Sequence, residues 1–340
     1  MTEMITVAVD AMGGDHAPDV VLDGAEQALR ASERLKVLLC GPAEVVEPFA
    51  ASHERCEAVP CTEVIAMDEH PAQAVRNKKD SSIVVGCRMV KDGRAAGFFT
   101  AGSTGAGLAA GTLVIGRIKG VQRPAIATVV PKPGRPLILC DVGANADCKV
   151  SYLVQFAQMA SVYARLTMGV RNPEVGLLNI GSEDTKGSQF AQECFTLLKE
   201  QLSNFKGNAE GTSLFTDDFD VIVTDGFTGN VTLKTFEGTA RFLFGLLRDA
   251  ATKAMAEGGS SGQQPAGLMR IAGQLKQTVN PDTYGGAPIL GLRGTVLIGH
   301  GASNATAIMN GILATARCIE MGVTEATEEA IAQIREETHG

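Results

Sequence analysis

Residues 5–31 read ITVAVDAMGGDHAPDVVLDGAEQALRA and contain, in order, the signals of a strand, a glycine turn and a helix. The run 5–9 is rich in β-branched residues, and apolar residues recur at helical spacing from about 20 to 31. Further strands are predicted at 36–40, 95–100, 125–130, 137–140, 174–180, 220–224 and 295–298. Strands that alternate with helices predict a mostly parallel sheet with helices on both faces, a three-layer α/β/α fold.

The composition fits a globular protein with a substantial core. The chain has 340 residues, of which 45% are hydrophobic and 20% charged, so we expect two lobes or one large α/β unit and no extended disorder. The net charge of −8 argues against nucleic acid as a partner, because such binding depends on a basic surface. The eight cysteines include no C-x-x-C pair, which favours free thiols in a reducing compartment over a metal finger.

The sequence predicts a cytoplasmic protein. Its apolar runs stay below the ~18 residues of a membrane span, and residues 1–14 lack the basic end and long apolar stretch of a signal peptide. Any contact with a membrane is therefore expected to be peripheral.

Six loops that follow predicted strands are rich in Gly, Asp, Asn, Thr and Lys. They span 10–18, 100–107, 141–149, 179–187, 224–230, and 284–288 together with 299–304. Ligands of open α/β sheets bind outside the carboxyl ends of the strands, and backbone N–H groups at helix starts suit a phosphate. The six loops together predict a polar cleft for a phosphate-bearing ligand, but they do not identify the reaction.

Each loop also has a structural interpretation. Asp15 in the first loop and the hydroxyl residues of the second would serve equally as helix caps, and capping by Thr228 competes with a binding role in the fifth. Lys186 would suit an anionic substrate, although a solvated lysine at a helix end is more common. No histidine lies near Cys148 in the sequence to activate it, so we interpret it as a packing residue and not as an acyl-cysteine nucleophile.

At these residues the chain resembles the PlsX family of bacterial phosphate acyltransferases. The resemblance extends over nearly the whole chain and is carried by the motifs DAMGGDHAP from Asp10, TAGSTGA from Thr100, DVGANADCK from Asp141, LLNIGSEDTKG from Leu177, VTDGFTGN from Val223, YGGAPILGL from Tyr284 and HGASN from His300. It implies a fold similar to isopropylmalate dehydrogenase and phosphotransacetylase, with two lobes around a cleft. It also implies transfer of a long acyl chain from acyl carrier protein to inorganic phosphate, which feeds glycerol-phosphate acylation in phospholipid synthesis, with no metal or redox cofactor.

The resemblance implies roles for particular residues. The expected catalytic group is Lys186, Asp225 and Asn230: Lys186 holds phosphate or the oxyanion, and Asp225 orients that lysine or manages a proton. The expected substrate- and phosphate-binding residues are Asp10, Gly14, Asp15, Ser103, Thr104, Gly105, Asn145, Asp147, Lys149, Thr228, Gly229, His300 and Ser303.

The expected domains are a first lobe of residues 1–110 plus 285–340 and a second lobe of 111–284. The second lobe carries a projecting helix pair whose tip lies near 257–265, in the sequence EGGSSGQQP. Apolar residues from Phe236 to Ala254 recur on one helical face ahead of this tip. The pattern alone favours dimer packing for that face, whereas the resemblance raises contact with a lipid surface.

The resemblance implies several partners: acyl carrier protein, a second copy of the chain, the inner face of the cell membrane, and the membrane glycerol-phosphate acyltransferase. An acidic carrier needs a basic landing place, and two stretches, 76–94 and 117–135, are rich in Lys and Arg. Three other functions remain open: a phosphotransacetylase acting on short-chain acyl-CoA, a metal- and nicotinamide-dependent decarboxylating dehydrogenase, and a phosphate-sensing scaffold without turnover.

Overall fold

The computed structural model describes residues 4–132, 134–256 and 284–339, together with the single residues 267, 270 and 273. In this part of the chain, eleven strands form one continuous sheet in the order β3-β2-β1-β4-β11-β10-β5-β6-β9-β7-β8. The strands are β1 (Ile5–Asp10), β2 (Leu35–Gly41), β3 (Cys56–Pro60), β4 (Gly97–Thr100), β5 (Ala125–Val130), β6 (Leu137–Cys140), β7 (Val175–Leu178), β8 (Phe205–Ala209), β9 (Val221–Val223), β10 (Ala287–Leu290) and β11 (Thr295–Ile298).

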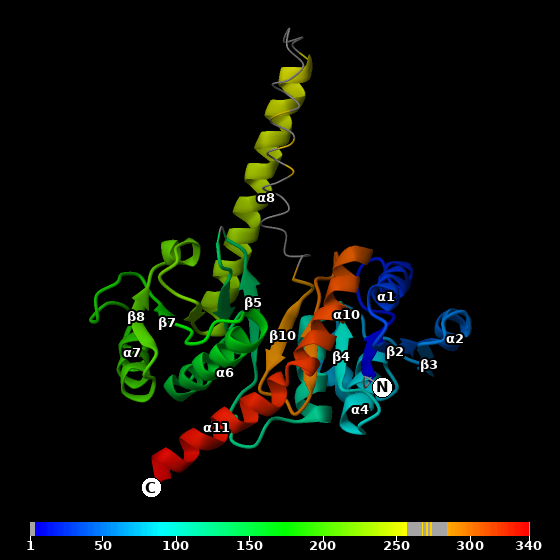
Figure 1. Cartoon of the computed structure of the whole chain (residues 1–340), viewed down its shortest axis with the longest axis horizontal. Helices are drawn as coiled ribbons and strands as arrows, with labels where there is room; N and C mark the ends of the chain where they lie inside the picture. Colours follow the sequence, from blue (N-terminus) through cyan, green and yellow to red (C-terminus); the bar gives the residue numbers. More distant parts are fainter. Residues whose placement is uncertain are drawn as a thin grey trace.

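Helices cover both faces of this sheet (Figure 1). They are α1 (Asp19–Ala31), α2 (Ala43–Ala51), α3 (Pro71–Asn77), α4 (Ser82–Lys91), α5 (Thr104–Ala110) with a π-helical continuation (Gly111–Ile115), α6 (Val150–Met168), α7 (Gln189–Gln201), a 3₁₀ turn (Gly211–Phe215), α8 (Gly226–Ala256), α10 (Ala305–Glu320) and α11 (Val323–His339).

Alternating strand residues point into two separate cores. Val7 and Val9 of β1 belong to the core under α1, α6, α7 and α10, whereas Ala8 belongs to the core under α4 and α5. Ile222 and its neighbours in β9 divide in the same way. Because side chains of a strand alternate between faces, this division confirms the predicted three-layer α/β/α fold.

The sheet is mixed, and its antiparallel pairs lie at its centre. β10 pairs antiparallel with β11 and with β5, and β5 pairs antiparallel with β6; the other pairs among the described strands are parallel. The β5–β6 pair is an antiparallel hairpin. A mostly parallel sheet is confirmed.

Three strands have no clear signal in the sequence. β3 and β8 are the two edge strands, and their exposed faces carry polar residues such as Glu57 and Lys206 instead of an apolar run. β10 is a four-residue strand that begins after Gly286 and ends before Gly291, and these glycines together with Pro288 give the stretch the signals of a turn.

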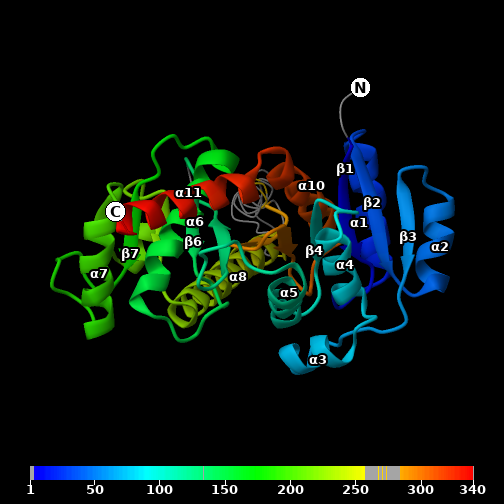
Figure 2. The same cartoon turned by 90° about the horizontal axis from the view of Figure 1, so that it is seen from below.

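The two predicted lobes contribute separate halves of the sheet. β1 to β4, β10 and β11 are consecutive in the strand order, and β5 to β9 make up the remainder. The last helix crosses this boundary, because α11 packs on α6 (Figure 2). The division into lobes of residues 1–110 plus 285–340 and 111–284 stays a prediction.

Helix α8 projects from the body as a single long helix (Figure 1). At 1.5 Å per residue, its 31 residues are about 46 Å long. The predicted tip at 257–265 lies outside the described residues, as does most of the second helix of the pair. Within the described residues, no helix combines the length and apolarity needed to cross a membrane.

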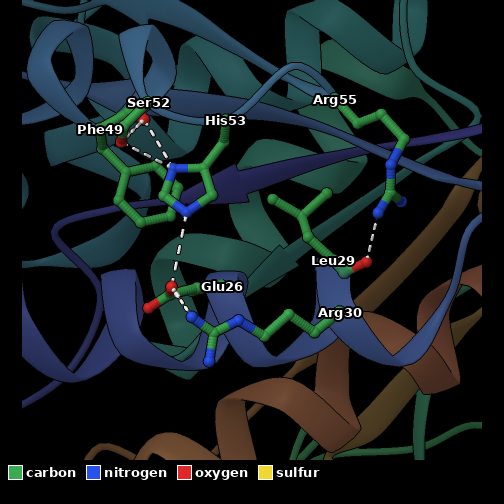
Figure 3. Close-up of polar contacts among 7 residues, drawn as sticks. All are labelled: Glu26, Leu29, Arg30, Phe49, Ser52, His53 and Arg55. Carbon is green, nitrogen blue, oxygen red and sulfur yellow. Dashed lines mark hydrogen bonds and ion pairs between the residues drawn. The ribbon is translucent and has the colours of Figure 1, made fainter.

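His53 and Arg55, which come directly after α2 in the chain, contact residues of α1 (Figure 3). Arg55 donates hydrogen bonds to the carbonyl oxygens of Leu29 (2.5 Å) and Leu35 (2.9 Å), which satisfies a carbonyl in the last turn of α1. His53 stacks on Phe49 with ring centroids 4.1 Å apart and lies 3.8 Å from a carboxylate oxygen of Glu26.

The contact of α1 with α10 is close enough to test. A β-carbon at Gly24 would lie 2.5 Å from Cβ of Ile308, so Gly24→Ala should lower the free energy of unfolding by about 1–3 kcal/mol through overpacking. Gly238 of α8 has no heavy atom within 4 Å of the same position, so Gly238→Ala should be neutral or stabilising by up to about 1 kcal/mol. Urea denaturation of both variants measures the difference, and equal stabilities would contradict the packing described.

Candidate active site

A cavity of about 730 Å³ lies where the two halves of the sheet meet. Its walls come from α5, β5, the loop after β6, α8, the residues before β10, and the β11–α10 loop. Four of the six predicted strand-end loops therefore contribute to one cavity. Its volume is in the range of small-molecule sites.

The cavity is lined by both apolar and polar side chains. The apolar side chains are those of Leu108, Ile126, Val129, Val142, Leu233, Phe236, Ala240, Phe244 and Ile298. The polar side chains are those of Thr104, Thr128, Asn230, Lys234, Glu237, Arg241, Tyr284, His300 and Ser303. Such a lining suits an amphipathic ligand that has an apolar chain and an anionic or carbonyl group.

The buried carboxylate of Asp141 organises the loop after β6. Its Oδ1 accepts hydrogen bonds from the backbone N–H groups of Ile126 and Ala144, each at 3.0 Å. Its Oδ2 accepts from the backbone N–H of Asn145 at 2.8 Å and from the Asn145 amide at 2.9 Å. Burial raises the pKa of this carboxyl, and the hydrogen bonds oppose that shift.

The start of α8 packs directly on this loop. The N–H of Gly226 donates to the carbonyl oxygen of Asn145 at 2.8 Å. A β-carbon at Gly229 would lie 1.9 Å from the carbonyl oxygen of Asp141, so only glycine permits this approach. The glycines of the DGFTGN sequence thus fix where α8 begins and place Asn230 beside Gly143 on the cavity wall.

Asp225 and Thr228, both predicted to be functional, form the cap of α8. The carboxylate of Asp225 accepts hydrogen bonds from the Thr228 N–H at 2.8 Å and from the Thr228 hydroxyl at 2.7 Å. This is the geometry of an N-cap. The described residues that line the cavity include neither of these two residues.

The first loop is tied to the second by Asp10. Its buried carboxylate accepts from the Thr100 hydroxyl at 2.7 Å and from the Met12 N–H at 3.0 Å. The hydroxyl oxygen of Thr100 accepts in turn from the N–H of Gly102 at 2.9 Å. Desolvation raises the pKa of Asp10, and these hydrogen bonds oppose that shift while they join the two turns.

Neighbouring backbone contacts join the first and sixth loops. The Asp15 N–H donates to the carbonyl oxygen of Gly301 at 2.8 Å, and a β-carbon at Gly14 would lie 3.1 Å from the same oxygen. The Asp15 side chain is exposed. These contacts connect the first loop to Gly301, which follows the cavity residue His300.

Ser103, Thr104 and Gly105 form the start of α5. The buried Ser103 hydroxyl accepts from the Ala106 N–H at 3.4 Å and caps the helix. Thr104 and Gly105 line the cavity. In this loop Ser103 therefore acts as a helix cap, whereas Thr104 and Gly105 are placed where they could contact a ligand.

His300 and Ser303 also line the cavity, from the β11–α10 loop. His300 is exposed, and its Nδ1 accepts a hydrogen bond from the Ala302 N–H at 3.2 Å. The neutral imidazole therefore carries its proton on Nε2, which becomes a hydrogen-bond donor.

Other predicted residues lie away from the cavity lining. Lys186 is exposed and 3.8 Å from the Glu183 carboxylate, in the loop after β7. Asp147 and Lys149 are exposed, and Lys149 directly precedes α6. Asn145 directs its amide to Asp141 and, at 2.9 Å, to the carbonyl oxygen of Pro124. β6, β9 and β7 are adjacent parallel strands. The loops with Asp141, Asp225 and Lys186 therefore lie next to one another at the carboxyl ends of these strands.

Sequence reasoning missed the contribution of α8 to the cavity wall. Lys234 forms an ion pair with Glu237 at 2.8 Å, whereas Arg241 has no ion pair among the described residues. The spacing of Asn230, Lys234, Glu237 and Arg241 places them on one helical face, a signal that was present in the sequence.

The described residues contain no group of three or more His, Cys, Asp or Glu side chains positioned to hold a metal ion.

The sequence matches a known protein family and several curated proteins. Residues 5–326 match the family described as "Fatty acid synthesis protein". A phosphate acyltransferase of Desulfitobacterium hafniense (strain Y51) is 46% identical over 333 residues, which cover 96% of this chain and 98% of the relative. A phosphate acyltransferase of Bacillus pumilus is 40% identical over 326 residues, with 96% and 97% coverage.

Solved structures of phosphotransacetylases share the fold. A phosphotransacetylase from Streptococcus pyogenes aligns with a TM-score of 0.59 at 16% identity, covering 93% of this chain and 94% of the other. One from Staphylococcus aureus aligns with a TM-score of 0.58, with the same identity and coverage. The predicted phosphotransacetylase-like fold class is confirmed.

The interpretation of Cys148 as a packing residue and not a covalent nucleophile can be tested. Desolvation raises the pKa of its thiol to about 11, and Sγ lies 3.4 Å from the carbonyl oxygen of Asn145 as a donor, so the group is a protonated thiol at neutral pH. The turnover number of Cys148→Ser should therefore be close to that of the unchanged protein. Loss of a covalent nucleophile would instead lower turnover by orders of magnitude. A thioester adduct trapped on the unchanged protein and absent from Cys148→Ser would contradict this assignment.

Proposed function

The chain belongs to the fatty acid synthesis protein family and is an acyltransferase, and on that premise we propose that it transfers a long acyl chain from acyl carrier protein to inorganic phosphate. The products are an acyl phosphate and free carrier protein. The acyl phosphate would then feed glycerol-phosphate acylation in phospholipid synthesis.

The observation that carries this proposal is the amphipathic lining of the cavity. A long acyl chain requires an extended apolar wall, which α8 and β5 provide. The reacting thioester and phosphate require hydrogen-bond donors, and the side chains of Thr104, Asn230 and His300 lie on the same cavity.

The reaction requires no redox step. An oxygen of hydrogen phosphate bonds to the thioester carbonyl carbon, which gives a tetrahedral intermediate with a negative oxygen. The carbon–sulfur bond then breaks, and the proton of the hydrogen phosphate passes to the departing thiolate. The protein must hold one polyanion and stabilise a second negative oxygen, which are positioning and electrostatic tasks.

We assign these tasks to donors near the polar part of the cavity. His300, through Nε2–H, and Asn230, through its amide, donate to the oxyanion or to the phosphate. Lys186 holds phosphate at the neighbouring strand end, and Asp225 positions the first turn of α8 through the cap that it forms with Thr228. Arg241, on the wall of the cavity, supplies a further positive charge to anionic substrates.

The proposed partners include the acidic carrier protein, a second copy of the chain, and the inner face of the cell membrane with its glycerol-phosphate acyltransferase. Of the basic residues expected to receive the carrier, Lys132 is 6% exposed and bonds to Asp217 at 3.1 Å, and Arg135 pairs with Asp220 at 2.6 Å. We therefore place the carrier contact on exposed cations such as Arg117, Lys119 and Arg123. The exposed Phe242, Leu243 and Leu246 of α8 support a lipid or dimer contact.

The proposed activity is tested by trapping its product. Purified protein, palmitoyl-carrier protein and phosphate should yield acyl phosphate, measured as the hydroxamate after addition of hydroxylamine, and omission of phosphate should abolish it. Acetyl-CoA is run in parallel, because the shared fold makes a short-chain phosphotransacetylase the alternative. Product from acetyl-CoA alone would establish that alternative, and product from neither substrate would contradict the proposal.

The role of Lys186 has a matched control. Lys186→Ala removes a hydrogen-bond donor to an anion. We expect kcat/KM for phosphate to fall by about 100-fold, through a lower kcat, a higher KM or both. Lys206 is also exposed and pairs with Glu174 at 2.9 Å on an edge strand, so Lys206→Ala should leave kinetics unchanged. If the two variants behave alike at both limiting and saturating phosphate, the assignment of Lys186 fails.

A further inference from the structure

The cavity-facing surface of α8 consists of two parallel rows of side chains. One row is polar and contains Asn230, Lys234, Glu237 and Arg241. The other is apolar and contains Leu233, Phe236, Ala240 and Phe244. Both rows advance by three or four residues per step, so each follows the helix axis.

The apolar row is packed against the protein at its beginning. Leu233 and Phe236 are partly buried and pack against the core that also contains Ile126, and Phe236 contacts Phe215, with ring centroids 5.3 Å apart. Ile126 and Val129 of β5 line the same cavity. An apolar ligand between α8 and β5 would therefore contact apolar side chains from both elements.

Ala240 is the smallest side chain in the row. Phe236 and Phe244 lie one turn before it and one turn after it, and are about 12 Å apart along the axis at 1.5 Å per residue. The row thus has a recess between two aromatic side chains, and the residue at its base decides how much apolar chain fits.

The direction of the row relates this recess to the reacting groups. Asn230 starts the cavity-facing surface next to Gly143, in the region of the strand-end loops. Phe244 lies fourteen residues further along α8, about 21 Å away along the axis. A chain whose carbonyl lies near Asn230 would extend past Ala240 toward Phe244.

We propose that the acyl chain of the substrate lies along this apolar row and that Ala240 is a specificity-determining residue for chain length. This inference rests on the proposed acyl transfer to phosphate and adds to it the placement of the chain. Each buried methylene contributes to binding, so blocking the recess removes affinity for long chains and spares short ones.

The test compares chain lengths in the full-length protein. Ala240→Phe should lower kcat/KM for palmitoyl-carrier protein by about tenfold or more and leave kcat/KM for octanoyl-carrier protein within about twofold. Thr239→Phe is the matched control, because it introduces the same side chain one residue earlier, at a position that is exposed and outside the cavity lining. It should leave the ratio of the two substrates unchanged.

A second variant tests the same inference in the opposite direction. Phe244→Ala opens the far end of the row and should raise kcat/KM for chains longer than palmitoyl relative to palmitoyl itself. This variant decides the question if Ala240→Phe proves to be unfolded in thermal denaturation.

The outcomes separate this inference from the proposed function. If the unchanged protein makes no acyl phosphate from either chain length, the proposed function fails. If it does, but the variants change both chain lengths equally or not at all, the function stands and the placement of the acyl chain is wrong.

Discussion

The arrangement of the site depends on the buried carboxylate of Asp141 and the four hydrogen bonds that it accepts. These bonds join the start of β5, through Ile126, to the 141–145 loop after β6. An ionised or neutral carboxyl without such partners would be costly to bury. Because the loop is held in this shape, its backbone offers the surface on which α8 begins.

The position of α8 follows from that loop. Gly229 allows the first turn of the helix to rest on the carbonyl oxygen of Asp141, and Gly226 bonds to Asn145. The helix then faces β5 across the cavity before it projects from the body (Figure 1). A single helix therefore supplies a polar row and an apolar row to the same cavity, and the proposed function uses the first for the reacting carbonyl and the second for the acyl chain.

Sequence reasoning predicted the layers of the fold, and four of the six predicted loops contribute to the cavity, because both depend on local patterns. Strand-turn-helix order is visible in short windows, and Thr104, Gly105, Asn230, His300 and Ser303 do line one cavity. The edge strands β3 and β8 were missed because their exposed faces lack an apolar run. The apolar face from Phe236 to Ala254 predicts dimer packing or a lipid contact and not a cavity wall, since periodicity shows that a helical face is apolar but not what covers it. Only the folded chain shows that Lys186 and Asp225 are absent from the cavity lining, because this depends on how the strands are arranged.

The acyl chain is proposed to occupy the cavity between α8 and β5. This placement can be examined with a palmitoyl-carrier protein whose chain ends in a photoreactive diazirine, followed by mass spectrometry of the crosslinked peptides. Labels are expected on α8 between residues 236 and 244 and on residues 126–131, which lie in β5 and directly after it, with competition by unlabelled palmitoyl substrate. Labels that resist this competition, or that map only to surfaces distant from the cavity such as α2 or α7, would contradict it.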